Sequence, residues 1–313
     1  AIVSMFLGTD LSEILDAIVN DTAYDSKEKE IMRIGVHTLP KFPKDTTDRN
    51  RTSPFAFTGN KFEFRMLGSA SSISCANTVL NTAVAETLKG FADYLEGKDD
   101  FEKALHDLIK DTIKAHKRII FNGDGYDDKW VKEAESRGLL NLKTTPEALT
   151  HLLDEKNIKL FESHKVYSKA ELTARYEVLN ENYGKVINIE ALTMLDMARK
   201  DILPAMSEFA KKLSKSALEK KEFVADVDLT YEKETVKKLG DMTKEAYKHV
   251  LKLEEDLSAA KDITSAPEYA MYCKDKILPD MAALRISVDS AEAIASKKDW
   301  PYPSYGELLF GVR

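Results

Sequence analysis

Two charged residues, Glu63 and Arg65, stand two positions apart in the stretch TGNKFEFRML, which spans residues 58–67. Because successive side chains of a β-strand point to opposite faces, this spacing places both charges on one face and Phe62 and Phe64 on the other, which we expect to face the core. A carboxylate offers hard oxygen ligands to a divalent cation, and a guanidinium can bind an anionic group with two parallel hydrogen bonds. The pair therefore suits a site that holds a metal ion beside an anion. An ordinary strand with its polar face in water would show the same alternation.

A hairpin is needed to position these two residues. A Gly-Asn turn at residues 59–60 is flanked by strand-like segments with phenylalanines at alternate positions, which predicts a hairpin with a two-residue loop. Continuing the pairing outward from this turn puts Ala56 opposite Glu63 and Pro54 opposite Arg65. We expect these small or stiff neighbours to leave room for a ligand beside the charged pair.

The remaining elements change in character near residue 97. Before it, an apolar strand is predicted at residues 2–7 and a helix of about two dozen residues at 74–96, which ends at a glycine. After it, nearly every segment has helical periodicity. We therefore predict an α+β fold that is mostly helical, with short antiparallel strands followed by a helical bundle, and two domains at 1–97 and 98–313.

Two apolar stripes with alternating spacings of three and four residues give the strongest periodicity in the chain. The first stripe consists of Val236, Leu239, Thr243, Ala246, Val250, Leu253, Leu257 and Ala260. The second consists of Ile277, Met281, Leu284, Val288, Ala291 and Ala295. Such spacing is typical of the seam of a coiled coil, and the polar turn at residues 261–265 connects the two stripes. They predict a coiled-coil-like antiparallel pair inside the bundle.

Composition limits the classes of protein to which this chain can belong. Of the 313 residues 43% are hydrophobic, so the chain can bury a sizeable core, and 46 basic against 53 acidic residues leave a net charge of −7. No run of about 18 apolar residues is present. We expect a cytoplasmic protein that binds neither nucleic acid nor a membrane. Cys75 and Cys273 have no partners at metal-ligand spacing, so we expect both to be core thiols.

Several stretches resemble one family. The segment FPKDTTDRNRTSPFAFTGNKFEFR at residues 42–65 is similar to the carboxy-terminal strands of the glutamine synthetase catalytic domain, in the form found in the large type III enzymes. The opening AIVSMFLG resembles the sequence after the glutamate-bearing flap of that family, and WPYPSYGELLF at residues 300–310 resembles the end of the type III chains. The resemblance covers essentially the whole chain, and residues 40–90 carry most of its specificity.

The resemblance implies roles for four residues. Glu63 matches a glutamate that binds one of two active-site metal ions, and Arg65 matches an arginine on the substrate side of the transferred phosphoryl group. Arg51 matches the arginine of an Asn-Arg-Ser/Thr motif near the substrate and nucleotide phosphates, and Arg49 is a further candidate for binding them. Many relatives carry another arginine five residues after that motif's arginine. This chain has Ala56 there, so no functional arginine is carried over to that position.

The implied activity is the ATP-dependent ligation of ammonia to glutamate through an acyl phosphate, with Mg²⁺ or Mn²⁺ as cofactor. The family's remaining metal ligands lie upstream of the matching region, so the chain is expected to be the carboxy-terminal part of a larger, homo-oligomeric enzyme and to lack activity when isolated. One alternative stays open, in which the chain is a non-catalytic helical scaffold or assembly module and the hairpin is only structural.

Overall fold

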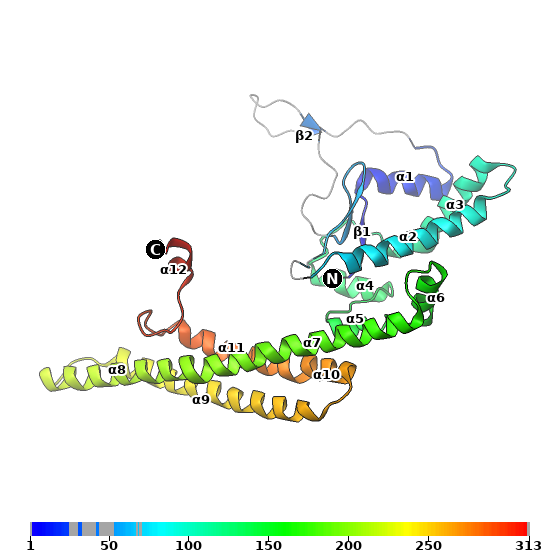
Figure 1. Ribbon diagram of the computed structural model, residues 1–313. Coiled ribbons are helices and arrows are strands. Elements are labelled where there is room, and N and C mark those ends of the chain that lie inside the picture. Colours follow the sequence, from blue (N-terminus) through cyan, green and yellow to red (C-terminus); the bar gives the residue numbers. More distant parts are fainter. Residues whose placement is uncertain are drawn as a thin grey trace. The chain divides into compact units, whose positions relative to one another are not determined.

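The structure is a computed structural model, and it describes residues 2–24, 53–66, 68 and 71–311. It also describes the backbone of two short strands, β2 (Ile31–Met32) and β3 (Phe42–Pro43), which pair in antiparallel fashion. The chain divides into two compact units (Figure 1). The first comprises Ala1–Lys143 with Glu155–Lys169, and the second comprises Thr144–Asp154 with Ala170–Arg313.

A three-stranded sheet in the first unit contains the predicted hairpin. Its order is β1 (Met5–Phe6), β4 (Phe55–Phe57) and β5 (Phe62–Phe64), with β1 parallel to β4 and β5 antiparallel to it. Gly59 has a φ of 99° in the turn between β4 and β5, a conformation that glycine adopts without steric cost. The predicted register is confirmed, because β4 and β5 pair with Ala56 opposite Glu63.

Apart from β2 and β3, the other described elements of the first unit are helices. They are α1 (Thr9–Asn20), α2 (Ser74–Leu95), α3 (Phe101–His116), the 3₁₀ turn η1 (Lys117–Ile119), α4 (Asp128–Ser136) and α6 (Glu155–Ser163). A small core forms where the ring of Phe121 stacks on the buried Trp130 at a centroid distance of 3.8 Å, beside Ile2. The Asn122 side chain accepts hydrogen bonds from the backbone N–H groups of Leu7 and Gly8, at 3.0 and 3.1 Å, and so fixes the end of β1.

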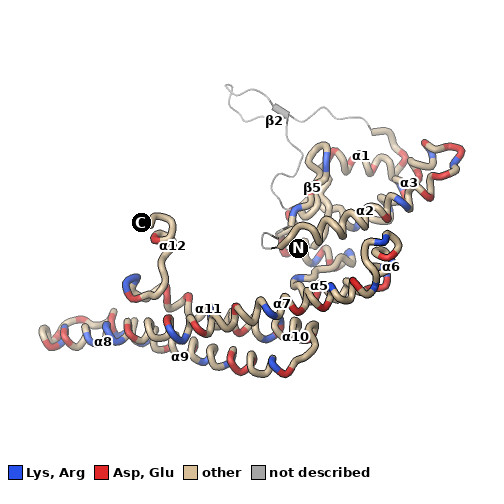
Figure 2. The backbone as a smooth tube through the Cα atoms, in the orientation of Figure 1, with Lys and Arg blue, Asp and Glu red and all other residues tan. Residues whose placement is uncertain are grey.

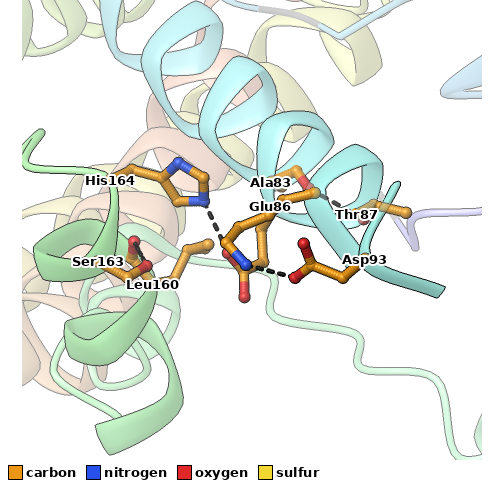
Figure 3. A network of polar contacts seen from close by, with 8 residues as sticks. Ala83, Glu86, Thr87, Asp93, Leu160, Ser163 and His164 are labelled. Atoms are coloured by element: carbon orange, nitrogen blue, oxygen red, sulfur yellow. Dashed lines mark hydrogen bonds and ion pairs between the residues drawn. The ribbon is translucent and has the colours of Figure 1, made fainter. Parts of the chain in front are cut away.

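A polar contact connects α2 with the end of α6. His164, just after α6, lies 2.7 Å from Glu86 of α2, measured between Nε2 and Oε2 (Figure 3). One helical turn further along α2, Lys89 pairs with Asp93, so charged groups line this side of the helix. The predicted helix at 74–96 is confirmed. Several apolar residues of this helix are exposed, however, such as Val84 with 54% of its surface accessible.

The second unit is a bundle of long helices. Its elements are α5 (Thr145–Leu149), α7 (Lys169–Met197), the π turn η2 (Ala198–Ile202), α8 (Leu203–Phe223), α9 (Thr230–Ala259), the 3₁₀ turn η3 (Ala260–Asp262), α10 (Ala266–Tyr272), the π turn η4 (Cys273–Ile277), α11 (Leu278–Glu292) and α12 (Tyr305–Phe310). Helix α9 packs against both α8 and α11, and Figure 1 shows α7 continuing through η2 into α8.

Each π turn is followed by a leucine and then by a proline. In η2 the N–H of Leu203 donates to the carbonyl of Ala198, and Pro204 follows; in η4 the N–H of Leu278 donates to Cys273, and Pro279 follows. A proline inside a helix lacks the N–H and its ring collides with the carbonyl four residues earlier. The wider turn separates these groups, so each helix continues past its proline.

The two predicted stripes form the main core of the second unit, which confirms the coiled-coil-like pair. Buried residues of α9 meet buried residues of α7, η4 and α11. The α9 members are Ala246, Val250, Leu253 and Leu257, and those of η4 and α11 are Cys273, Ile277, Met281 and Leu284. Cys273 is a core thiol, as predicted, but Cys75 is exposed at the start of α2, so that prediction was wrong for one of the two cysteines.

Gly184 provides a test of the packing between α7 and α10. A Cβ added there would lie 2.4 Å from Cδ1 of Tyr269, whereas one added at Gly240 of α9 would meet nothing within 4 Å. We expect Gly184→Ala to lower the free energy of unfolding by about 1–2 kcal/mol through overpacking. Gly240→Ala should raise it by about 0.5–1 kcal/mol through helix propensity. Urea unfolding of both variants measures the difference, and equal effects would contradict the close packing of Tyr269.

Charges of both signs alternate along the helices, without a continuous basic stripe in the part that the structure describes (Figure 2). Most ion pairs within a helix connect residues three or four positions apart, such as Lys185 with Glu181. None of the described helices is both long enough and apolar enough to cross a membrane.

Candidate functional site

Glu63 and Arg65 contact each other on β5 and just after it. The Nε and Nη2 atoms of Arg65 both donate to Oε2 of Glu63, at 3.2 and 3.0 Å. Lys61 Nζ lies 3.3 Å from the other carboxylate oxygen, Oε1. The strand alternation that the sequence predicted therefore brings one carboxylate and two cations together on one face of the hairpin.

The electrostatics of this group favour an ionised carboxylate. The hydrogen bond from Arg65, followed by that from Lys61, holds the pKa of Glu63 below its ordinary value. The Arg65 side chain is only 16% exposed, whereas that of Glu63 is 38% exposed and that of Lys61 66%. The guanidinium is thus held inside the protein surface while the carboxylate remains within reach of solvent.

The exposure of the two hairpin faces differs from what the sequence predicted. Phe62 and Phe64 were expected to face the core, but they are 49% and 40% exposed, and Ala56 on the charged face is fully buried. The rings of β5 each pack against one ring of β4, at centroid distances of 5.3 Å for Phe57–Phe62 and 4.9 Å for Phe55–Phe64. Because β5 is the last strand of the described sheet, its rings have a packing partner on one side, and the other side remains exposed.

A buried serine adds a polar group to the charged face. The pairing of β1 with β4 and of β4 with β5 places Ser4, Pro54 and Arg65 in one row across the sheet, and the N–H of Arg65 donates to the carbonyl of Pro54 at 2.7 Å. Ser4 is 1% exposed, and its hydroxyl has no hydrogen-bond partner within the described structure. Ser4 was not among the site residues predicted from the sequence. The available signal was a single polar residue inside the apolar segment at 2–7.

The hairpin carries only Glu63 and Arg65 of the four predicted site residues. Arg49 and Arg51 lie outside the described residues. Within the described part of the chain, no group of three or more His, Cys, Asp or Glu side chains is arranged to hold a metal ion. Glu63 therefore offers one carboxylate to a metal ion, and a complete coordination sphere would need further ligands.

Comparison with known proteins shows which proteins this chain is similar to. Residues 104–221 match the family model described as "Glutamine synthetase C-terminal domain". The chain is 41% identical over 318 residues to a glutamine synthetase of Butyrivibrio fibrisolvens, an alignment that covers 100% of this chain and 45% of the relative. It is 39% identical over 321 residues to the Type-3 glutamine synthetase of Dictyostelium discoideum and 33% identical over 326 residues to a glutamine synthetase of Bacteroides fragilis. These alignments cover 99% of this chain and 43% and 44% of the two relatives.

Over its whole length this chain is therefore similar to glutamine synthetases, and residues 104–221 match the C-terminal domain of that family. Its similarity includes the type-3 form, as the resemblance of residues 42–65 predicted. The chain spans less than half the length of these curated relatives. The domain boundary near residue 97 stays a prediction.

Proposed function

We propose that this chain contributes part of the active site of a glutamine synthetase, which ligates ammonia to glutamate at the expense of ATP. The observation that carries the proposal is the largely buried Arg65 guanidinium held beside the solvent-accessible Glu63 carboxylate, within a chain whose relatives are named glutamine synthetases. Formation of an acyl phosphate concentrates negative charge on phosphoryl oxygens, and fixed cations lower the energy of that charge.

Each residue has a defined task in this proposal. Arg65 neutralises the transferred phosphoryl group on the substrate side, and Arg51, with Arg49, contacts the substrate and nucleotide phosphates. Glu63 supplies one oxygen ligand to Mg²⁺ or Mn²⁺. Such an ion would polarise the phosphoryl oxygens of ATP.

The Glu63 carboxylate is suited to exchange its partners. Its contact with Lys61 lies at the surface, because 66% of that lysine side chain is exposed, and such ion pairs contribute little energy. Glu63 would therefore be able to exchange its contact with Lys61 for a metal ion without losing its hydrogen bonds from Arg65. Glu63 would then hold the ion, and Arg65 would keep the carboxylate in place.

The other metal ligands are proposed to come from the part of the enzyme that matches the remaining length of the relatives. We propose further that this chain alone is inactive and that the complete protein is a cytoplasmic homo-oligomer with glutamate, ammonia and ATP as its substrates. The helical bundle of the second unit then serves as the structural part of the subunit.

A comparison of two proteins tests this function. The protein encoded by the whole gene should form glutamine from glutamate and ammonia only when ATP and Mg²⁺ or Mn²⁺ are present, and the isolated 313-residue chain should form none. Glutamine and ADP released together measure the reaction. Absence of glutamine formation by the whole protein would contradict the proposal and favour a non-catalytic scaffold, and activity of the isolated chain would show that the site needs no further ligands.

A further inference from the structure

Two aspartates from neighbouring helices meet inside the bundle of the second unit. Asp256 near the end of α9 is 7% exposed, and its Oδ1 accepts hydrogen bonds from Lys252 Nζ at 2.8 Å and from the Tyr272 hydroxyl at 3.3 Å. Asp280 lies in the first turn of α11, within hydrogen-bonding reach of Asp256. The Oδ2 atoms of both aspartates are buried and have no donor within the described structure.

A single proton on one of the two carboxyl groups would give both buried oxygens a hydrogen-bond partner. A carboxylate oxygen only accepts hydrogen bonds, so two ionised carboxylates that face each other leave two acceptors unpaired and repel one another. A buried acceptor without a donor destabilises the folded state. If one carboxyl group carries a proton, its O–H donates to the other and both orphan oxygens become partners.

The charges around the pair decide which carboxyl group carries the proton. Lys252 contacts Asp256 directly, and the hydrogen bond from Asp280, followed by that from Lys252, lowers the pKa of Asp256. Burial, followed by the hydrogen bond to Asp256, raises the pKa of Asp280 to about 6 from its ordinary value of 3.8. The other titratable groups that act on this cluster are Glu255 on α9, Tyr272 at the end of α10 and Lys276 in the π turn η4.

The two aspartates lie where a shared proton can affect the contact between α9 and the π turn η4. Tyr272 immediately precedes the π turn η4, and Leu278 and Pro279 separate the end of this turn from Asp280. The Asp256 carboxylate of α9 therefore contacts side chains on both sides of the wide turn. Because a π turn and a proline both weaken the backbone hydrogen bonding of a helix, this junction depends on its side-chain contacts.

We propose that Asp256 and Asp280 share a single proton. This proton stabilises the contact between α9 and the junction of α10 and α11, and the stabilisation depends on pH. Protonated, the pair bridges the two helices through one O–H···O bond. Deprotonated, it places two negative charges on either side of the same interface, which loosens the contact at the π turn.

The sign of the pH effect follows from linkage. Since the pKa of Asp280 is higher in the folded chain, its contribution to stability is fully present below the unfolded value of 3.8 and is lost as the pH rises through about 6. The pKa of Asp256 is lowered, so its contribution is present above its ordinary value and is lost in stronger acid. The pair therefore stabilises the bundle most near pH 4, and this stabilisation decreases as the pH rises toward about 6.

Asp280→Asn tests the proposal, because the asparagine amide donates a hydrogen bond to Asp256 at every pH. Between pH 5 and pH 8 the folding equilibrium constant of the wild type should fall about tenfold more than that of the variant. At pH 8 the variant should be the more stable of the two. Denaturant unfolding of the complete chain at both pH values gives these constants.

A matched control and a second measurement complete the test. Asp289→Asn removes an exposed carboxylate of the same helix that pairs with Arg285 at 3.2 Å, and its pH dependence should follow that of the wild type. Carboxyl ¹³C NMR of the wild type should show an aspartate that titrates near pH 6 and disappears in Asp280→Asn. Parallel pH curves for wild type and Asp280→Asn, or titration of both aspartates below about pH 4.5, would overturn the shared proton.

Discussion

Replacing Arg65 by methionine is expected to lower ATP-dependent glutamine formation by roughly a thousandfold or more in the whole protein that contains this chain. The substitution removes the guanidinium proposed to neutralise the transferred phosphoryl group, while methionine retains much of the apolar stem in a position that is 16% exposed. Glu63→Gln should have an effect of similar size, because a neutral amide binds a divalent cation weakly. Steady-state rates at saturating ATP and glutamate measure both effects.

Lys61→Met is the matched control for these two variants. Lys61 contacts the same carboxylate at 3.3 Å and lies on the same hairpin face, but its side chain is largely exposed. It should retain a rate close to that of the wild type. The thermal unfolding midpoints of all three variants should also stay close to the wild-type value. A rate for Arg65→Met within severalfold of the wild type would refute the role assigned to it.

Leu253→Ala and Leu284→Ala are each expected to lower the free energy of unfolding by about 2–5 kcal/mol. Both leucines are almost fully buried, at 0% and 1% exposure, where α9 and α11 meet α7. The loss combines the transfer of the removed methyl groups with the cavity that remains, because the surrounding long helices cannot collapse into it. Urea or thermal unfolding of the chain measures the change.

The same two helices offer exposed partners for comparison. Leu251 of α9 is 46% exposed and Ile286 of α11 is 68% exposed, each two positions from its buried counterpart. Their replacement by alanine should change the free energy of unfolding by no more than about 0.5 kcal/mol. Similar losses for Leu251→Ala and Leu253→Ala would mean that the face of α9 that packs in the bundle has been assigned incorrectly.

The sequence pattern predicted the core seam of the bundle and the register of the hairpin, because both depend on local backbone geometry. The spacing of the apolar residues around Leu253 and Leu284 identified the core seam, since a helix of fixed pitch leaves one face for burial. The Gly-Asn turn at residues 59–60 determined the register of the hairpin, and with it the contact between Glu63 and Arg65.

Features that depend on what packs against an element were not predictable in this way. Alternation separated the two faces of β5 correctly, but it could not tell which face the rest of the fold covers, so Phe62 and Phe64 were assigned to the core while they are exposed. The burial of Ser4 depends likewise on neighbouring strands far along the chain. The meeting of Asp256 with Asp280 requires two helices to pack in one particular register, which neither helix specifies alone.

The π turns before Pro204 and Pro279 have a consequence for how related sequences can differ in length. A π turn holds one residue more than an α-helical turn, and here that residue gives each proline ring the space it needs. Loss of one residue from residues 198–202 or 273–277 would return the proline to a regular helix, where it costs about 3 kcal/mol. Substitution of the proline alone would leave a wide turn with no ring to accommodate. Relatives that lack one residue in either π turn should therefore also lack the proline that follows it. Helix length and the presence of proline should change together at these two positions.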